Sequence, residues 1–287
     1  MSTQTIPAPT VVREPHLTAP DLDFVRRSKP VHVIVDSLVL AKRHVSRIPR
    51  QLDWLVGVTV MPVMFLLLFR YIFGDTVQAT LPAGVDAVNY LVAAIIVQGL
   101  VFGSMNTGLG LAMDAKEGLM DRFASLPMTR SAVVLGRILA DLGIAIFTTT
   151  ITIVVGLAVG FRPSASVVEW LAAIGLMILM AFTLAWLGAI IGLWLKTVEA
   201  VNSIGFTLIF PLTFLSSTFI NPDFLPGFLE GFAKNQPFTL LLDATRGLLN
   251  GYPDVGNKAW LVTLYLLLAQ VVLIPAALWM YERRSKQ

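Results

Sequence analysis

Residues 114–137 read DAKEGLMDRFASLPMTRSAVVLGR, a charged stretch between two long apolar runs. Its apolar residues recur at spacings of four, four and three: Ala115, Leu119, Phe123 and Leu126. Such spacing places them on one face of a helix. Pro127 ends the pattern, because proline lacks an amide hydrogen and restricts the residue before it. The stretch therefore predicts a short amphipathic helix over residues 114–127, either a docking surface or an ordinary solvated loop helix.

The composition of the whole chain is that of a multi-span membrane protein. Of its 287 residues, 56% are hydrophobic and 14% are charged, and the mean hydropathy is +0.76. Soluble domains carry about 25% charged residues, so the chain is too apolar for that class. It has no cysteine, which excludes disulfides, a thiol nucleophile and thiolate metal sites.

Six apolar segments each reach the ~20 residues that cross a bilayer core. Their expected bounds are Leu52–Phe73, Tyr90–Met113, Val133–Phe161, Val167–Leu195, Val201–Ile220 and Trp260–Met280. We therefore predict an all-α membrane protein whose six-span domain covers residues 51–281. A mobile cytosolic tail over residues 1–30, without a signal-peptide core, precedes it, and a basic cytosolic tail over residues 282–287 follows it.

The distribution of basic residues predicts the orientation. Most of the 21 lysines and arginines fall before the first predicted span, in the 114–137 stretch and after the last span. Lys and Arg accumulate on the cytoplasmic side of a membrane protein. We expect a multi-pass protein of the cell membrane with both termini and the charged stretch in the cytoplasm.

A second amphipathic pattern precedes the first span. Apolar residues recur there every three or four positions: Val31, Ile34, Leu38, Ala41, Val45 and Ile48. Arg43, Arg47 and Arg50 fall on the other side. The pattern predicts a helix over residues 31–50 that lies in the membrane surface, with its basic face toward anionic lipid head groups. A nucleic-acid-binding helix is the alternative, and it fits poorly beside a membrane span.

The longest segment outside the membrane, residues 221–258, contains two short apolar patterns. The first consists of Leu225, Phe228, Leu229 and Phe232. The second consists of Leu241, Leu242, Thr245 and Leu248. Asn235, Gln236 and Pro237 break the chain between them. Two short helices that re-enter the outer leaflet and the packing of an ordinary loop both fit this pattern.

Few residues inside the predicted spans are polar. Asp141 lies four residues after Arg137, so we predict that the two form an ion pair on one helix face. An intramembrane carboxylate is also a candidate functional group. Three glycine pairs predict close approaches between helices. These pairs are Gly99 with Gly103, Gly156 with Gly160, and Gly188 with Gly192.

Several chemistries do not fit the chain. It has no G-x-x-x-x-G-K-[ST] phosphate loop, no H-E-x-x-H and no G-x-S-x-G. Its three histidines all precede the first span. We therefore expect neither an enzyme nor a metal site. A proton-coupled carrier would bury several carboxylates near the midplane, and none is clearly placed at that depth.

Two groups of residues resemble the membrane subunits of daunorubicin/doxorubicin-type drug exporters, which are type-2 ABC exporter permeases. The first group is Glu117-Gly118, Arg122-Phe123, Leu126-Pro127, Arg130 and Gly136-Arg137. The second group is FPLTFLS over residues 210–216, Pro222, Leu225-Pro226, Asn235-Gln236-Pro237 and Arg246-Gly247. Asn-Pro is the commoner form in that family, and this chain inserts Gln236. The resemblance runs from about Val31 to the C-terminus.

The resemblance implies a six-span half-transporter. It would pair with a second permease copy and with two ATP-binding cassette subunits, which would hold the ATP and Mg. The coupling helix seated on the ATPase would contain Glu117, Gly118, Asp121, Arg122 and Pro127. The connecting helix would carry Arg43, Arg47 and Arg50, and the external re-entrant motif would comprise Asn235, Pro237, Arg246 and Gly247.

The expected function is export of an amphipathic drug-like or lipid-like molecule. A permease for a polysaccharide or lipid-linked glycan keeps the same fold and is one alternative. An ATP-independent carrier or membrane scaffold is another. Membrane lipid is an expected partner, and nucleic acid is not.

Overall fold

The computed structural model describes residues 30–47, 52–119, 130–195, 197–218, 222–254, 256 and 258–284. Its α-helices there are α1 (Pro30–Arg47), α2 (Leu52–Tyr71), α3 (Gly74–Thr80), α4 (Ala87–Lys116), α6 (Arg130–Ala158), α7 (Val167–Leu195), α8 (Val198–Phe214), α9 (Gly227–Asn235), α10 (Pro237–Asn250) and α11 (Lys258–Arg284). A 3-10 turn, η3, covers Pro222–Phe224. These residues contain no strand, which confirms the all-α prediction. The predicted tail over residues 1–30 lies almost wholly outside the described residues.

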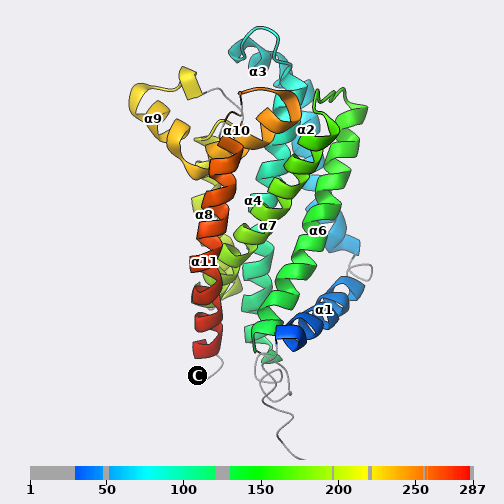
Figure 1. Ribbon diagram of the computed structural model, residues 1–287, viewed down its shortest axis with the longest axis vertical. Helices are drawn as coiled ribbons and strands as arrows, with labels where there is room; N and C mark the ends of the chain where they lie inside the picture. The colour runs from blue at the N-terminus through cyan, green and yellow to red at the C-terminus, as the bar shows by residue number, and fades with distance from the viewer. Residues whose placement is uncertain are drawn as a thin grey trace, which may run out of the picture.

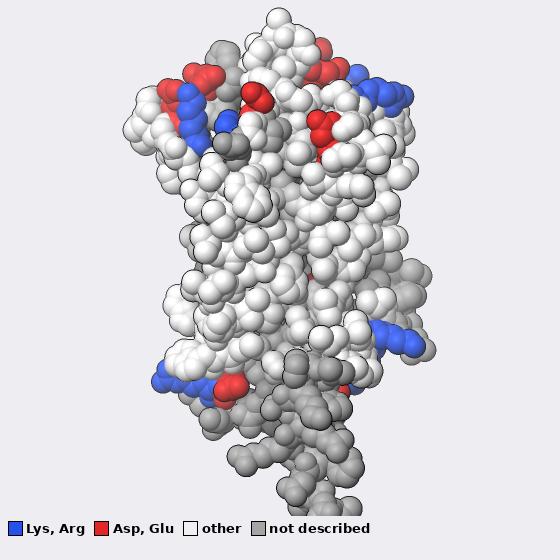
Figure 2. Space-filling model, in the orientation of Figure 1, with Lys and Arg blue, Asp and Glu red and all other residues white. Residues whose placement is uncertain are grey.

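Four of these helices are long and apolar enough to cross a membrane: α4, α6, α7 and α11. Helices α2 and α3 meet at a bend of 69° and could together make a fifth span. In Figure 1 the long helices run side by side, with α1 and the end of α11 at one end of the molecule and α3, α9 and α10 at the other. In Figure 2 the charged side chains gather at the two ends, and the wide band between them is mostly white. This pattern is that of a multi-pass membrane protein.

Helix α8 differs from the predicted fifth span. The apolar run suggested a helix over Val201–Ile220, whereas α8 begins at Val198 and ends at Phe214. The prediction is wrong at the carboxyl end, because residues 215–218 form a turn and the helix does not continue through them. The Gln236 side chain, which lies between α9 and α10, donates hydrogen bonds to the carbonyl oxygens of Leu212 and Leu215 at this end of α8.

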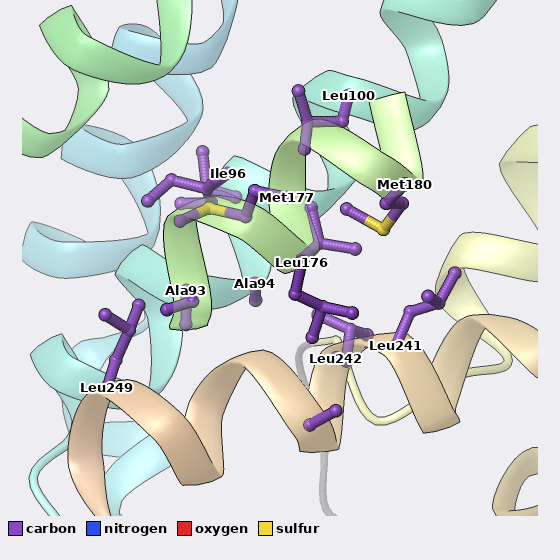
Figure 3. Packing of buried hydrophobic residues seen from close by; sticks show 14 of the residues in the cluster. Ala93, Ala94, Ile96, Leu100, Leu176, Met177, Met180, Leu241, Leu242 and Leu249 are labelled. Atoms are coloured by element: carbon purple, nitrogen blue, oxygen red, sulfur yellow. The ribbon is translucent and has the colours of Figure 1, made fainter. Parts of the chain in front are cut away.

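Helix α4 forms the centre of the bundle. Its buried residues pack against α7 and α10, and Figure 3 shows this contact from close by. The labelled residues of α4 are Ala93, Ala94, Ile96 and Leu100. Those of α7 and α10 are Leu176, Met177, Met180, Leu241, Leu242 and Leu249. Because lipid tails are as apolar as these side chains, the contact is stabilised by van der Waals packing rather than by removal from water.

The closest approach in the bundle joins α4 and α7. A Cβ atom on Gly188 would overlap the carbonyl oxygen of Ser104, and one on Gly192 would overlap that of Gly108. This glycine pair therefore lets two helix backbones touch, as predicted. In the second pair only Gly156 of α6 makes a close approach, since its Cβ would lie 3.1 Å from Val92 of α4, whereas one on Gly160 would meet nothing within 4 Å. The remaining pair makes none, because a Cβ on Gly103 would meet nothing within 4 Å and one on Gly99 only Pro62 Cγ, at 3.9 Å.

The contact between α4 and α7 predicts a large effect of one added methyl group. We expect Gly188→Ala to lower the thermal stability of the purified protein, since overpacking a tight contact costs ~1–3 kcal/mol. Gly175→Ala is the matched control, because its Cβ would meet nothing within 4 Å on the same helix. Melting curves in detergent measure both. Equal melting temperatures for the two variants would contradict the packing described here.

Helix α1 packs along α6 at one end of the molecule (Figure 1). Leu40 and Ala41 are buried there, and Gly136 of α6 leaves no room for a Cβ beside Leu40. The residues of the predicted apolar stripe on α1 therefore do not all face the same environment. Ala41 faces the protein, whereas Ile34 and Leu38 are both 56% exposed. Helix α1 is amphipathic as predicted, but the face that packs on α6 is not the face that the spacing indicated.

Helix α11 extends further than predicted. It ends at Arg284, so the proposed basic tail over residues 282–287 begins inside the helix. Arg284 Nη1 donates to the carbonyl oxygens of Gly192 and Leu193, at 3.1 and 3.0 Å. These bonds satisfy carbonyl groups at the end of α7, which have no partner within their own helix. They join the carboxyl ends of two candidate spans.

Candidate functional site

A cavity of about 400 Å³ lies between α2, α4, α6 and α8. Four phenylalanines line it: Phe65, Phe102, Phe206 and Phe210. Its polar lining residues are Gln98, Asn106, Asp141 and Thr148. A concave, mainly apolar site with a few polar groups is the usual form of a small-molecule binding site.

The cavity exists because glycines line two of its walls. A Cβ on Gly57 of α2 or on Gly103 of α4 would meet nothing within 4 Å. One on Gly99 would meet only Pro62 Cγ, at 3.9 Å. Gly99 and Gly103 were predicted to bring helices together. They instead leave an open volume beside α4.

Two amides of α4 are available to a ligand. Gln98 is only 6% exposed and lines the cavity. Among the described residues its side chain makes no hydrogen bond, and the same is true of the Asn106 side chain. The polar atoms of both amides are accessible from the cavity, so a bound ligand with a donor or acceptor could supply the hydrogen bonds that they lack. These amides are the strongest sign of a ligand in the cavity.

Asp141 lies in the cavity wall within a polar cluster that joins α4 and α6. Arg137 Nε lies 3.2 Å from Asp141 Oδ2, which confirms the predicted ion pair. Thr107 of α4 donates to the same oxygen at 2.7 Å, and Arg137 Nη2 donates to the Asn106 carbonyl oxygen at 3.4 Å. Arg137 lies so close to Gly110 that a Cβ there would overlap the guanidinium. Because Arg137 compensates the carboxylate, the cavity presents hydrogen-bonding groups and aromatic surface rather than an unpaired charge.

The predicted coupling segment begins at the end of α4. Helix α4 runs through Lys116, so residues 114–116 are its last turn and not the start of a separate helix. Glu117 caps α4, and its N–H donates to the Met113 carbonyl oxygen at 2.9 Å. Gly118 ends the helix in the left-handed conformation, with φ of +67°. Asp121, Arg122 and Pro127 lie outside the described residues.

The predicted connecting-helix arginines are only partly described. Arg43 is exposed on α1. Arg47 is the last residue of that helix, but its side chain is outside the described part of the chain. Arg50 lies beyond it. The basic face of α1 therefore stays a prediction.

The segment over residues 221–258, predicted to be external, contains two short helices separated at Gln236. Helix α9 ends at Asn235, Gln236 is extended, and Pro237 is the first residue of α10. This confirms the predicted break. Lys234 Nζ lies 2.6 Å from both Asp223 and Glu230, and these hydrogen bonds hold the pKa of Lys234 above its ordinary value. The cluster is exposed, so it adds little to stability.

Gln236 and Arg246 join this segment to the bundle. Gln236 Nε2 donates to the carbonyl oxygens of Leu212 and Leu215, at 3.2 and 2.8 Å. Arg246 is completely buried. Its Nη1 donates to Ser217 O at 2.6 Å, and its Nη2 donates to Thr218 O at 2.8 Å.

Arg246 also contacts α4. Its Nε donates to Tyr90 O at 3.2 Å, and its guanidinium lies 3.4 Å from the centroid of the Tyr90 ring. The neighbouring Gly247 accepts a hydrogen bond from the N–H of Gly251 at 2.9 Å, which closes α10. The Arg246-Gly247 motif could be identified from the sequence. Its partners could not, because Tyr90 lies 156 residues away along the chain.

The bundle of long apolar helices and the cavity among them define the class as a multi-pass membrane permease. The chain belongs to the ABC-2 type transporter family, whose family model matches residues 37–250.

Two curated proteins are similar to it. The daunorubicin resistance ABC transporter permease protein DrrB1 of Streptomyces coeruleorubidus is 28% identical over 205 residues, which cover 70% of this chain and 71% of the relative. The probable doxorubicin resistance ABC transporter permease protein DrrC of Mycobacterium tuberculosis is 24% identical over 233 residues, or 79% of this chain and 83% of the relative.

Proposed function

We propose that the chain is the membrane-spanning subunit of an ATP-binding-cassette exporter that moves an amphipathic drug-like or lipid-like molecule outward. The cavity between α2, α4, α6 and α8 is the observation that carries this proposal, because it combines aromatic walls with unpartnered amides. The family and the drug-resistance relatives support it. A glycan carries hydroxyl groups along its whole length, and the few polar groups of the cavity could not satisfy them.

The complete membrane domain would have six spans. They are the bent pair α2 and α3, the four long helices, and α8. With 17 residues, α8 is about 25 Å long, slightly less than the ~30 Å hydrocarbon core. The capped segment over residues 215–218 would complete its path. The charge distribution supports cytoplasmic termini.

Helices at both membrane surfaces would contact lipid. In α1, Ile34 and Leu38 are exposed beside Lys42, an arrangement that suits a helix lying in the inner surface. In α9, Phe228 is 82% exposed and Phe232 is 47% exposed, which supports insertion of the external helices into the outer leaflet. Both arrangements place apolar side chains in the bilayer and charges at its boundary.

Coupling to ATP would act through α4. The segment over residues 114–127 would sit on a partner ATPase that binds ATP and Mg, and a second permease copy would complete the pair. Helix α4 is one unbroken helix of 30 residues that carries Glu117 at its end and Gln98 and Asn106 in the cavity. A displacement of its cytoplasmic end would therefore reach the cavity wall directly.

Co-purification tests this function. We expect the tagged chain, extracted from its native membranes in mild detergent, to bring an ATP-binding cassette subunit and ATPase activity with it. Mass spectrometry identifies the partner, and the mass of the complex shows whether a second permease is present. A chain that reproducibly comes out alone, while a control ABC transporter keeps its ATPase, would favour the carrier or scaffold.

A further inference from the structure

Side chains from the external segment cap the outer end of α8. The last carbonyl groups of a helix have no partner within that helix. At the end of α8, Leu212 O and Leu215 O accept hydrogen bonds from Gln236, which is 4% exposed and is the N-cap residue of α10. The residue that precedes α10 therefore caps the end of α8 through its side-chain N–H groups, while its Oε1 is buried without a hydrogen-bond partner among the described residues.

Arg246 extends this junction to α4. Each of its three guanidinium nitrogens donates to a different backbone carbonyl: Tyr90 O, Ser217 O and Thr218 O. The side chain of Tyr90 contributes to the same junction, because its hydroxyl donates to Ser217 O at 2.6 Å. A buried charge is tolerated only when its donors are satisfied, and here one guanidinium joins three separate segments.

We propose that Arg246 and Gln236 are positioning residues that hold the outer ends of α4, α8 and α10 together as one rigid junction throughout export. Phe206 and Phe210 of α8 and Gln98 of α4 line the cavity below this junction. With their outer ends joined, α4 and α8 change their separation by pivoting, so a push at the cytoplasmic end of α4 alters the cavity. This role in export rests on the proposed function, whereas the junction itself does not.

Hydrogen exchange measures the junction in the purified full chain. Arg246→Lys keeps the charge but replaces a three-nitrogen fork with a single nitrogen, which cannot reach all three carbonyls. Gln236→Leu removes only the cap of α8 and serves as a second variant if Arg246→Lys folds poorly. We expect amide exchange over residues 212–218 and 239–246 to rise about tenfold or more in either variant.

Two matched variants control for the general effect of removing such groups. Gln270→Leu removes another interhelical amide bond, to Thr183 at 2.9 Å. Arg284→Lys changes an arginine that caps α7 through one nitrogen, a role that lysine can fill. Neither control should change exchange over residues 212–218. Exchange that is unchanged in both Arg246→Lys and Gln236→Leu would overturn the junction.

Export per ATP hydrolysed, measured in vesicles with the co-purified ATPase, separates positioning from simple stability. We expect this ratio to fall about tenfold in Gln236→Leu and Arg246→Lys. Without the junction α4 would no longer pivot, so ATP would still be hydrolysed but less substrate would be exported. A merely structural role would lower both activities equally, and an unchanged ratio would overturn the inference. Failure of the proposed function looks different, since the wild-type chain would then show no ATP-driven export at all.

Discussion

Gly103→Leu is expected to lower export about tenfold or more while the protein reaches the membrane in normal amounts. A Cβ on Gly103 would meet nothing within 4 Å, so the new side chain enters the cavity instead of disturbing a neighbouring helix. It would occupy space between Phe102 and Asn106, which line the same wall. A loss of ~1.4 kcal/mol in ligand binding is already tenfold. Vesicle uptake and ligand-induced thermal stabilisation measure the effect.

Gly143→Leu is the matched control for this prediction. Gly143 lies on α6, also has no neighbour within 4 Å of a Cβ, and is not among the residues that line the cavity. Both substitutions add the same side chain to a membrane helix, and only one of them fills the cavity. If Gly103→Leu exports and binds ligand as well as Gly143→Leu, the cavity is not the site through which the substrate passes.

The glycine pattern shows where prediction from the sequence reaches its limit. Gly188-x-x-x-Gly192 and Gly99-x-x-x-Gly103 have the same spacing and were given the same interpretation. The first pair meets the backbone of α4, and Gly103 faces open space. A missing side chain permits either a close contact or a void, and the position of the neighbouring helix decides between them. That position depends on the whole bundle rather than on local spacing.

Helix existence was predictable, because long apolar runs between charged segments are a strong and local signal. The end of α8 was not, since the apolar run continues past Phe214, the helix is capped by Gln236, and Arg246 binds the carbonyl groups of the turn that follows. The same reason explains which parts of the site were predictable. Arg137 and Asp141 share one helix turn, whereas the link from Arg246 to Tyr90 exists only in the folded chain.

Glu117→Ala is expected to abolish export by separating the permease from the ATPase partner proposed above. The Glu117 side chain is exposed and makes no hydrogen bond within the described part of the chain, so its loss leaves the bundle intact. It sits where Gly118 ends α4, at the end of the helix that reaches into the cavity. Truncating one partner of a charge pair buried at an interface costs ~2–5 kcal/mol, which corresponds to ~30-fold or more in affinity. We therefore expect the ATPase to be lost during purification.

Glu282→Ala is the control for this coupling prediction, because Glu282 is also an exposed acidic residue and lies near the end of α11 at the same end of the molecule. It should purify with the ATPase and export at the wild-type rate. Gly118→Pro provides an independent test, since proline cannot adopt the positive φ found there and would redirect the chain that follows α4. Both Glu117→Ala and Gly118→Pro should remain in the membrane and lose export. ATP-driven export at the wild-type rate in both variants, at normal expression, would show that the ATPase does not act on α4 at this end. The pivot proposed for the outer end of α4 would then need a different source of motion.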